Sequence, residues 1–292
     1  MFDLRYHVAS LAAVFLALII GILVGVALSD PTLADRTALR LKEGEVARLA
    51  AQLEAASQRS REQQAAEKFV EVGYEAAMKN RLAGKRIIVV FVGSVDRALE
   101  AHVEEALADA GADGARLRAL TVPIQGEAIQ AALRSRMSLA GYVGADHLAD
   151  LGRDLGRELV DGAETPLWDL LADEVLEERR GPDRGESDAV VVIRTSDPQI
   201  GRTARFLRGL YAGLAGSAPV VGVEATNAEP SAVAVYRNAD FSSVDSIETR
   251  LGKVSLAVLL RGGVEGHYGV KDTADALVPP VEPVQPPADE SG

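Results

Sequence analysis

The stretch Arg86-Ile-Ile-Val-Val-Phe-Val-Gly93 decides the fold of this chain. Every residue between Arg86 and Gly93 is apolar, and all but one of them are β-branched. A continuous run of this kind is typical of a strand that is buried on both faces of a sheet. Such strands need helices on both sides, so the run predicts an α/β domain.

Alternating helical and extended patterns follow this run. The helical patterns cover residues 98–110, 127–137 and 197–214. The extended patterns cover residues 116–122, 188–194, 219–223 and 254–260. Strands that alternate with helices form a mostly parallel sheet, so we expect residues 82–278 to fold as a Rossmann-like, doubly wound domain.

Capping residues help to place two of these elements. Asp197 is a good N-cap, and Pro198 then occupies the first position of the helix that ends near Leu214. Asp245 and Glu248 have the spacing of a capping box just before the last expected strand.

Residues 161–187 interrupt the alternation. An amphipathic helix is expected from Thr165 to Arg180, followed by a loop through Ser187. Trp168 is expected to pack with Leu171 and Val175 against the sheet rather than to stack on a ligand.

A long helical segment precedes the domain. Residues 30–81 are rich in Ala, Glu, Gln, Arg and Leu, which favour helices. Apolar residues occupy heptad positions at Leu39, Val46, Leu49 and Leu53. Lys42 interrupts this heptad repeat, and beyond Ala56 its positions are polar. The segment is therefore predicted to be a helical stalk, which either pairs as a short parallel coiled coil or stays a solvated helix.

The N-terminal segment has the length of a membrane span. Residues 8–28 carry no charged side chain, and a helix of that length extends about 30 Å, the thickness of a bilayer core. Residues 1–29 are therefore predicted to be a short tail and a transmembrane anchor. A signal peptide cleaved near Ala27-Leu28-Ser29 is the alternative, but its apolar region is usually shorter.

Two features of the anchor concern its partners and orientation. Gly21 and Gly25 form G-x-x-x-G, a spacing that lets two helices approach closely and that predicts a helix-dimer face. Arg5 precedes the span and several basic residues follow it, so charge counting alone would leave the large domain in the cytoplasm. Because long domains are translocated regardless of charge, the orientation stays open at this point.

Composition excludes several classes of protein. The net charge of −12 argues against a nucleic-acid partner, because binding to phosphate backbones needs a basic surface. The chain has no cysteine, which excludes disulfides, zinc–thiolate sites and thiol catalysis. Residues 279–292 are rich in proline and acidic side chains, so they are expected to form a disordered tail.

Motifs of enzymes are missing from the sequence. Val92-Gly93-Ser94-Val95-Asp96 ends the first strand and is neither G-x-G-x-x-G nor a P-loop. No serine lies in a G-x-S-x-G elbow, and the histidines are far apart in sequence, at His7, His102, His147 and His267. The sequence predicts a protein that is not an enzyme and holds no cofactor.

A metal site is not expected either. Copper prefers sulfur ligands or clustered imidazoles, and the only sulfur atoms belong to Met1, Met78 and Met137. In Gly266-His267-Tyr268-Gly269 the two glycines indicate a tight turn. This turn either presents His267 and Tyr268 for binding or only closes the last strand.

Three segments resemble a known family. The N-terminal one runs Leu4-Arg-Tyr-His-Val-Ala-Ser-Leu-Ala-Ala-Val-Phe-Leu-Ala-Leu18 and continues to Gly21 and Gly25. The second is Leu82-Ala-Gly-Lys-Arg86, and the third joins Ser242-Ser-Val-Asp-Ser-Ile-Glu-Thr249 and Gly252 to Gly266-His-Tyr-Gly269. Together they resemble the actinobacterial MctB family, whose members are named for copper transport at the mycobacterial outer membrane.

This resemblance implies a role in copper transport or homeostasis. It also implies a single-pass protein of the cytoplasmic membrane with its soluble domain facing outward. A copper ion is implied by this resemblance alone. The same family includes SteB-type proteins, which are membrane-anchored coiled-coil partners of the cytoplasmic SteA protein in septal cell-wall remodelling. The alternative implied role is therefore a dimeric scaffold with a SteA-like or cell-wall partner.

Overall fold

The computed structural model describes residues 14–25 and 31–283, apart from some side chains between residues 31 and 67. It divides into two compact units, residues 1–70 and 71–292. The helices are α2 (Pro31–Met78), α3 (Arg97–Asp109), α4 (Gly126–Arg134), α5 (Leu148–Asp161), α6 (Pro166–Val175), α7 (Gly201–Ala215), α8 (Val233–Asn238) and α9 (Arg250–Leu260). Short 3-10 helices lie at Met137–Tyr142 and Ala145–His147.

A seven-stranded sheet forms the centre of the second unit, in the order β3-β2-β1-β4-β5-β6-β7. Its strands are β1 (Ile87–Val92), β2 (Ala115–Leu120), β3 (Leu176–Arg180), β4 (Ala189–Arg194), β5 (Val220–Val223), β6 (Ser242–Val244) and β7 (His267–Tyr268). All neighbours pair in parallel except β3, which is antiparallel to β2. The predicted α/β class and mostly parallel sheet are confirmed.

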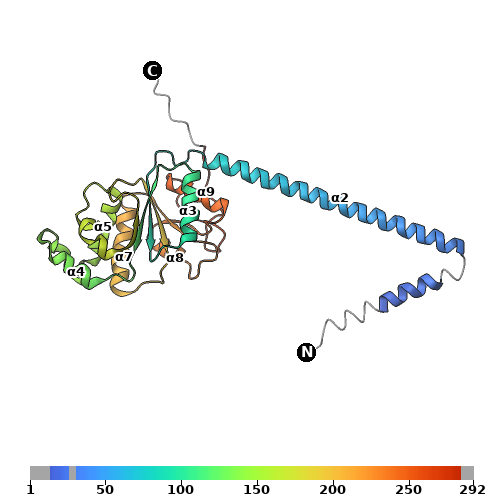
Figure 1. Ribbon diagram of the computed structural model, residues 1–292, viewed down its shortest axis with the longest axis horizontal. Helices are drawn as coiled ribbons and strands as arrows, with labels where there is room; N and C mark the ends of the chain where they lie inside the picture. Colours follow the sequence, from blue (N-terminus) through green and yellow to red (C-terminus); the bar gives the residue numbers. More distant parts are fainter. Residues whose placement is uncertain (1–13, 26–30, 284–292) are drawn as a thin grey trace, which may run out of the picture. The chain divides into compact units, whose positions relative to one another are not determined.

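Helices cover both faces of this sheet (Figure 1). Strand β1 shows why, since all six of its side chains are buried. Ile88, Val90 and Val92 face a cluster built with α4 to α8, whereas Ile87, Val89 and Phe91 face a cluster built with α3 and α9. The apolar run at residues 87–92 therefore divides the core into two halves.

Helices α5 and α7 pack with their backbones in direct contact. A Cβ atom built at Gly209 would lie 1.9 Å from the carbonyl oxygen of Ala149, and one at Gly213 would lie 2.0 Å from that of Arg153. On the facing helix, a Cβ atom at Gly152 would lie 2.2 Å from the carbonyl oxygen of Phe206. Only glycine permits this approach, because any other side chain would overlap the partner backbone.

Trp168 lies behind this helix pair and is buried in the same cluster as Leu171 and Val175, as expected. Its indole N–H donates to the carbonyl oxygen of Leu155 in α5 at 2.7 Å. The buried ring thus finds the hydrogen-bond partner that tryptophan needs in a core.

The structure corrects the element expected at residues 254–260. These residues belong to helix α9, which begins after Thr249, and the Thr249 hydroxyl accepts from the N–H of Gly252 at 2.9 Å. Nearly every residue of α9 is buried, so its sequence lacks a polar face. A short apolar run of this kind has no period that separates a buried helix from a buried strand.

Two further boundaries were wrong. The helix expected from Thr165 to Arg180 ends at Val175, and Leu176–Arg180 form strand β3. Charged residues are tolerated in β3 because it is an edge strand. Helix α7 begins at Gly201 rather than at Pro198, and in the loop before it the Gln199 side-chain amide donates to the carbonyl oxygen of Asp197 at 2.8 Å.

Helix α2 confirms the helical nature of the predicted stalk over Pro31–Met78. Its last residues belong to the second unit. There Met78, at the end of the helix, and Leu82, just after it, are buried in the core. Residues 14–25 of the predicted anchor are helical, whereas residues 1–13 and 26–30 lie outside the described part, as does the tail beyond residue 283. Within the residues that are described, no helix combines the length and apolar composition required for a membrane span.

Candidate functional site

The loops after β1 and β4 meet at the switch point of the sheet, where nucleotides bind in many folds of this type. The backbone N–H groups of Thr195 and Ser196 donate to the carbonyl oxygen of Val92 at 3.2 and 3.0 Å. Gly93 has a φ of +112°, and a Cβ atom there would lie 2.8 Å from the Thr195 hydroxyl oxygen. The chain itself therefore fills the crevice between these two loops.

A second, buried cluster lies at the carboxyl ends of β5, β6 and β7. Glu224 is 3% exposed and accepts from the hydroxyl of Ser231 at 2.7 Å and from the ammonium of Lys271 at 2.5 Å. Asp245 is 2% exposed and accepts from the backbone N–H groups of Val270 and Lys271 at 2.8 and 3.1 Å. We call Glu224, Asp245 and Lys271 the edge cluster.

Gly269 adapts the backbone to this edge cluster. It has a φ of +146°, and a Cβ atom on it would overlap the carboxylate of Asp245. The residues Ser242–Thr249 and Gly266–Gly269 are thus direct structural partners, since β6 pairs with β7 and Asp245 binds the segment after β7. A capping-box role for Asp245 was wrong, because the carboxylate binds this segment instead.

His267 and Tyr268 form β7, at the edge of the sheet. The Nδ1 atom of His267 lies 2.9 Å from the Ser243 hydroxyl oxygen, and its backbone N–H donates to the Asp275 carboxylate at 2.9 Å. Burial lowers the pKa of His267, and the nearby guanidinium of Arg237 lowers it further. Tyr268 is only 6% exposed, so its ring belongs to the core, while His267 is half-buried.

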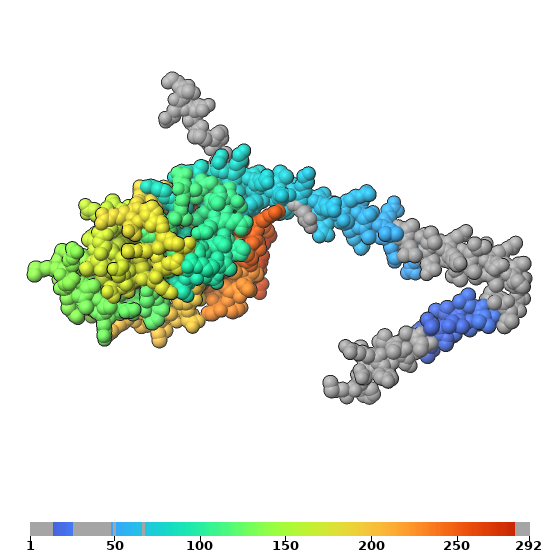
Figure 2. Space-filling model, in the orientation of Figure 1, coloured from blue at the N-terminus to red at the C-terminus, as the bar shows by residue number. Residues whose placement is uncertain are grey.

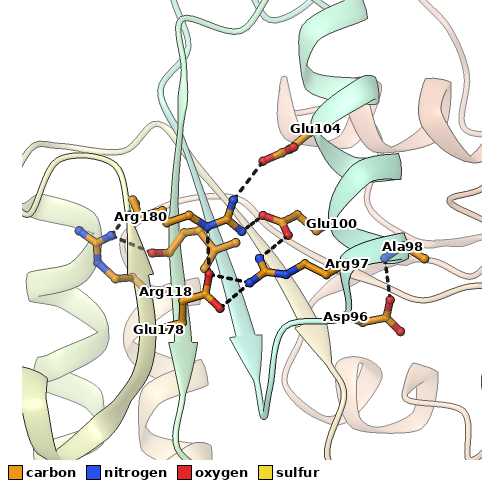
Figure 3. Close-up of polar contacts among 9 residues, drawn as sticks. Asp96, Arg97, Ala98, Glu100, Glu104, Arg118, Glu178 and Arg180 are labelled. Atoms are coloured by element: carbon orange, nitrogen blue, oxygen red, sulfur yellow. Dashed lines mark hydrogen bonds and ion pairs between the residues drawn. The ribbon is translucent and has the colours of Figure 1, made fainter.

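The opposite edge of the sheet is held by a charge network between β3 and α3 (Figure 3). Arg97 pairs with Glu178 at 3.0 Å, and Arg180 pairs with Glu100. The buried guanidinium of Arg118 donates to the carbonyl oxygen of Arg180 at 2.9 Å and continues to that of Pro182 at 2.6 Å. Figure 2 shows the yellow segment with β3 against the blue-green segment with α3.

The edge cluster holds the segment after β7 against the ends of β5 and β6, and the charge network ties the edge strand β3 to α3. Sequence reasoning missed the edge cluster, because Glu224 and Lys271 are single charged residues in stretches without a motif. Asp245 and Gly269 could have been singled out from the sequence, since both lie in the segments that carry the family resemblance. Glu178 and Arg180 were expected in a helix, whereas they lie in β3 and pair with residues of α3.

The part of the chain that the structure describes has no cluster of potential metal ligands. No three His, Cys, Asp or Glu side chains come together there in a way that could hold a metal ion. His102, His147 and His267 lie on α3, before α5 and in β7, respectively.

The remaining predicted site residues lie in the first unit. Gly21 and Gly25 belong to the helical residues 14–25. Leu39, Val46, Leu49 and Leu53 all lie in α2, and Leu53 is 70% exposed. The dimer face and the coiled-coil seam stay predictions.

Comparisons with known proteins agree on one family. Residues 1–279 match the family model described as "Copper transport outer membrane protein, MctB". Curated relatives include the copper transporter MctB of Mycobacterium bovis and that of Mycobacterium tuberculosis. Each is 27% identical over 313 aligned positions, which cover 92% of this chain and 96% of the relative.

Proposed function

The chain belongs to the MctB family, as its sequence predicted, and on this premise we propose that it serves copper transport or homeostasis in the cell envelope. The match over residues 1–279 carries the proposal, because it includes the N-terminal helix, the long helix α2 and the whole sheet. We place the α/β domain on the outer side of the cytoplasmic membrane, held there by one N-terminal span.

Copper is the cargo in this proposal and not a resident cofactor. The chain has no cysteine, and the described residues offer no cluster of three potential ligands. The described residues therefore do not fit a copper site built from sulfur and imidazole. The proposal assigns to the domain no step that requires bound copper.

Deletion of the gene tests this role. We expect the deletion strain to tolerate less copper and to retain more of it, with recovery when the full-length chain is supplied. Zinc is the matched control, since a general envelope defect would change tolerance to both metals. Unchanged copper tolerance and copper content in the deletion strain would contradict the proposal.

A second candidate function is a dimeric scaffold for septal wall remodelling, and α2 favours it. This helix exposes the apolar side chains of Leu53, Phe69, Val70 and Val72, and two of them, Leu53 at 70% and Val70 at 46%, lie on one heptad repeat. Val70 lies 21 residues, or three heptads, after Leu49 and so continues its position. A parallel coiled coil would bury these side chains.

Unique cysteines test the scaffold, because the natural chain has none. We expect Leu53→Cys to give dimers with a short bifunctional maleimide in cells, and a tagged chain to gather at septa. Ala51→Cys is the matched control, since it lies on the opposite side of the helix from the apolar repeat. Equal crosslinking at both positions, or a diffuse tagged chain, would argue against the scaffold.

A further inference from the structure

A cavity of about 380 Å³ lies between strands β2 and β3 and helices α5 and α6, and we call it the β2 cavity. Its lining includes Arg116 and Arg118, which lie on the same face of β2 because alternate residues of a strand share a face. Both arginines are buried, with Arg116 8% and Arg118 3% exposed. Burying a charge is costly unless the charge is paired, so both guanidinium groups need partners.

The partners that the protein itself provides are neutral. Arg116 donates through Nη2 to the carbonyl oxygen of Leu159 at 3.0 Å and to the hydroxyl of Ser187 at 2.6 Å. Arg118 donates through both Nη atoms, and its acceptors are all backbone carbonyl oxygens. Among the described residues, no carboxylate accepts a hydrogen bond from either guanidinium.

Arg116 also keeps donors that are free for a ligand. Its Nε and Nη1 atoms make no hydrogen bond with the described residues, and neither atom is sealed off from solvent. Burial and the nearby charges of Arg118 and Arg86 lower the pKa of Arg116 to about 10, so its side chain stays charged at neutral pH. Since Arg116 lines the cavity, a bound acceptor can reach these donors.

Three carboxylates of the lining have arginine partners at the rim of the cavity. Asp169 pairs with Arg184 at 2.6 Å, and Asp173 and Asp183 lie 3.9 and 4.0 Å from the guanidinium of Arg179. All three aspartates are exposed, so water screens their charges. They therefore oppose an anion near the buried arginines only weakly.

Glu158 also lines the cavity, and it is half-buried. Its carboxylate accepts from the backbone N–H groups of Leu167 and Trp168, each at 3.0 Å, in the first turn of α6. A helix N-terminus favours a negative charge, so this carboxylate has partners of its own. The buried charge that lacks an ionic partner is that of the two guanidinium groups.

We propose that the β2 cavity binds a phosphate group, either as free phosphate or as part of a small phosphate ester. The phosphate oxygens accept from the Nε–H and Nη1–H groups of Arg116, and the charge of Arg118 adds to the attraction. Guanidinium groups suit phosphate in both charge and hydrogen-bond geometry. This site is independent of the proposed role in copper transport.

Calorimetric titration of the full-length chain with sodium phosphate tests the proposal. We expect saturable binding, and none with sodium chloride at the same ionic strength. Glycerol 3-phosphate is titrated in parallel, and the tighter of the two phosphate compounds shows whether free phosphate or an ester is preferred. Absence of saturable binding for both compounds would overturn the proposal.

One variant tests the role of Arg116. Arg116→Met removes the charge and keeps an unbranched side chain, so it should weaken phosphate binding about tenfold or more. Circular dichroism shows whether this variant is folded. Phosphate binding that is unchanged in the folded variant would show that the site lies elsewhere.

A second variant leaves the buried residues untouched. Asp173→Lys reverses a charge at the rim, where the side chain is 93% exposed, and should tighten phosphate binding about twofold to threefold. Asp272→Lys is the matched control, because it changes the net charge equally at an exposed position after β7, outside the lining. Equal affinity of the two lysine variants for phosphate would contradict the proposal.

Discussion

Glycines four residues apart occur in two regions of this chain, and their surroundings differ. Gly152 and Gly156 on α5 face Gly209 and Gly213 on α7, and the two backbones lie against each other. At Gly21, in the N-terminal helix, an added Cβ atom would meet no described atom within 4 Å. The spacing alone permits close approach of two helices, and the neighbour decides whether the approach occurs.

The comparison shows that glycines four residues apart can serve two different contacts in one chain. In α5 and α7 the close approach is made by elements of the same unit. At Gly21 and Gly25 the predicted partner is a second copy of the chain. The following four predictions test the packing around α5 and the predicted contact at Gly21, in order of their expected effect on the α/β domain.

Gly209→Ala should have the largest effect. The added methyl group would meet the backbone of α5, and such overpacking costs about 1–3 kcal/mol of unfolding free energy. Gly73→Ala is the matched control, because a Cβ atom at this position of α2 meets nothing within 4 Å and alanine favours a helix by up to about 1 kcal/mol. Urea denaturation monitored by the fluorescence of Trp168, the only tryptophan, measures both. Equal effects of the two substitutions would contradict the close packing of α5 and α7.

Trp168→Phe should destabilise the domain by about 1–2 kcal/mol. It removes part of a buried ring and the hydrogen bond to Leu155, which supports α5 from behind. Tyr142→Phe is a suitable comparison, since it removes only the hydroxyl that donates to the Asp154 carboxylate at 2.8 Å. Circular dichroism during urea denaturation gives both values. A larger loss for Tyr142→Phe would show that α6 does not support α5.

Glu158→Gln should change how stability depends on pH. Burial raises the pKa of Glu158, although the N–H groups of Leu167 and Trp168 oppose this, so the folded state holds the proton more tightly than the unfolded state. Stability from this group is therefore complete at low pH and is lost as the pH rises from about 4 through the raised pKa. The native chain should lose stability relative to the Gln variant over that interval. Parallel pH profiles of the two proteins would refute the assignment.

Gly21→Ile should leave the stability of the α/β domain unchanged. If the N-terminal glycines contact a second chain, the substitution should lower the crosslinking of Leu53→Cys severalfold, because a larger side chain separates the helices. Leu23→Ile, on the other side of the same helix, is the control. Crosslinking that is equal in both variants would remove the predicted dimer face.

Much of the fold was predictable from sequence because its central strands are short and uniformly apolar. Residues 87–92, 189–194 and 220–223 each form a buried strand, and the patterns located all three. Helix α9 was mistaken for a strand since full burial removes the polar face that identifies an amphipathic helix. Strand β3 was mistaken for helix because its partners lie far away in sequence, in β2 and α3.

The candidate sites were less predictable. The edge cluster depends on Glu224, Asp245 and Lys271, which become neighbours only when β5, β6 and β7 align. The family, in contrast, was recognisable, because its segments at 4–18, 82–86 and 242–269 are continuous stretches of sequence.

The two ends of the α/β domain meet. The Arg261 guanidinium donates to the carbonyl oxygen of Arg81 at 2.7 Å, and Arg81 in turn donates to that of Glu282 at 3.0 Å. Met78 and Leu82 share their core cluster with α9. The bond between Arg261 and Arg81 joins residues 180 positions apart, so it forms only after α9 has been synthesised. The core around Met78 and Leu82 is therefore complete only once α9 has joined it.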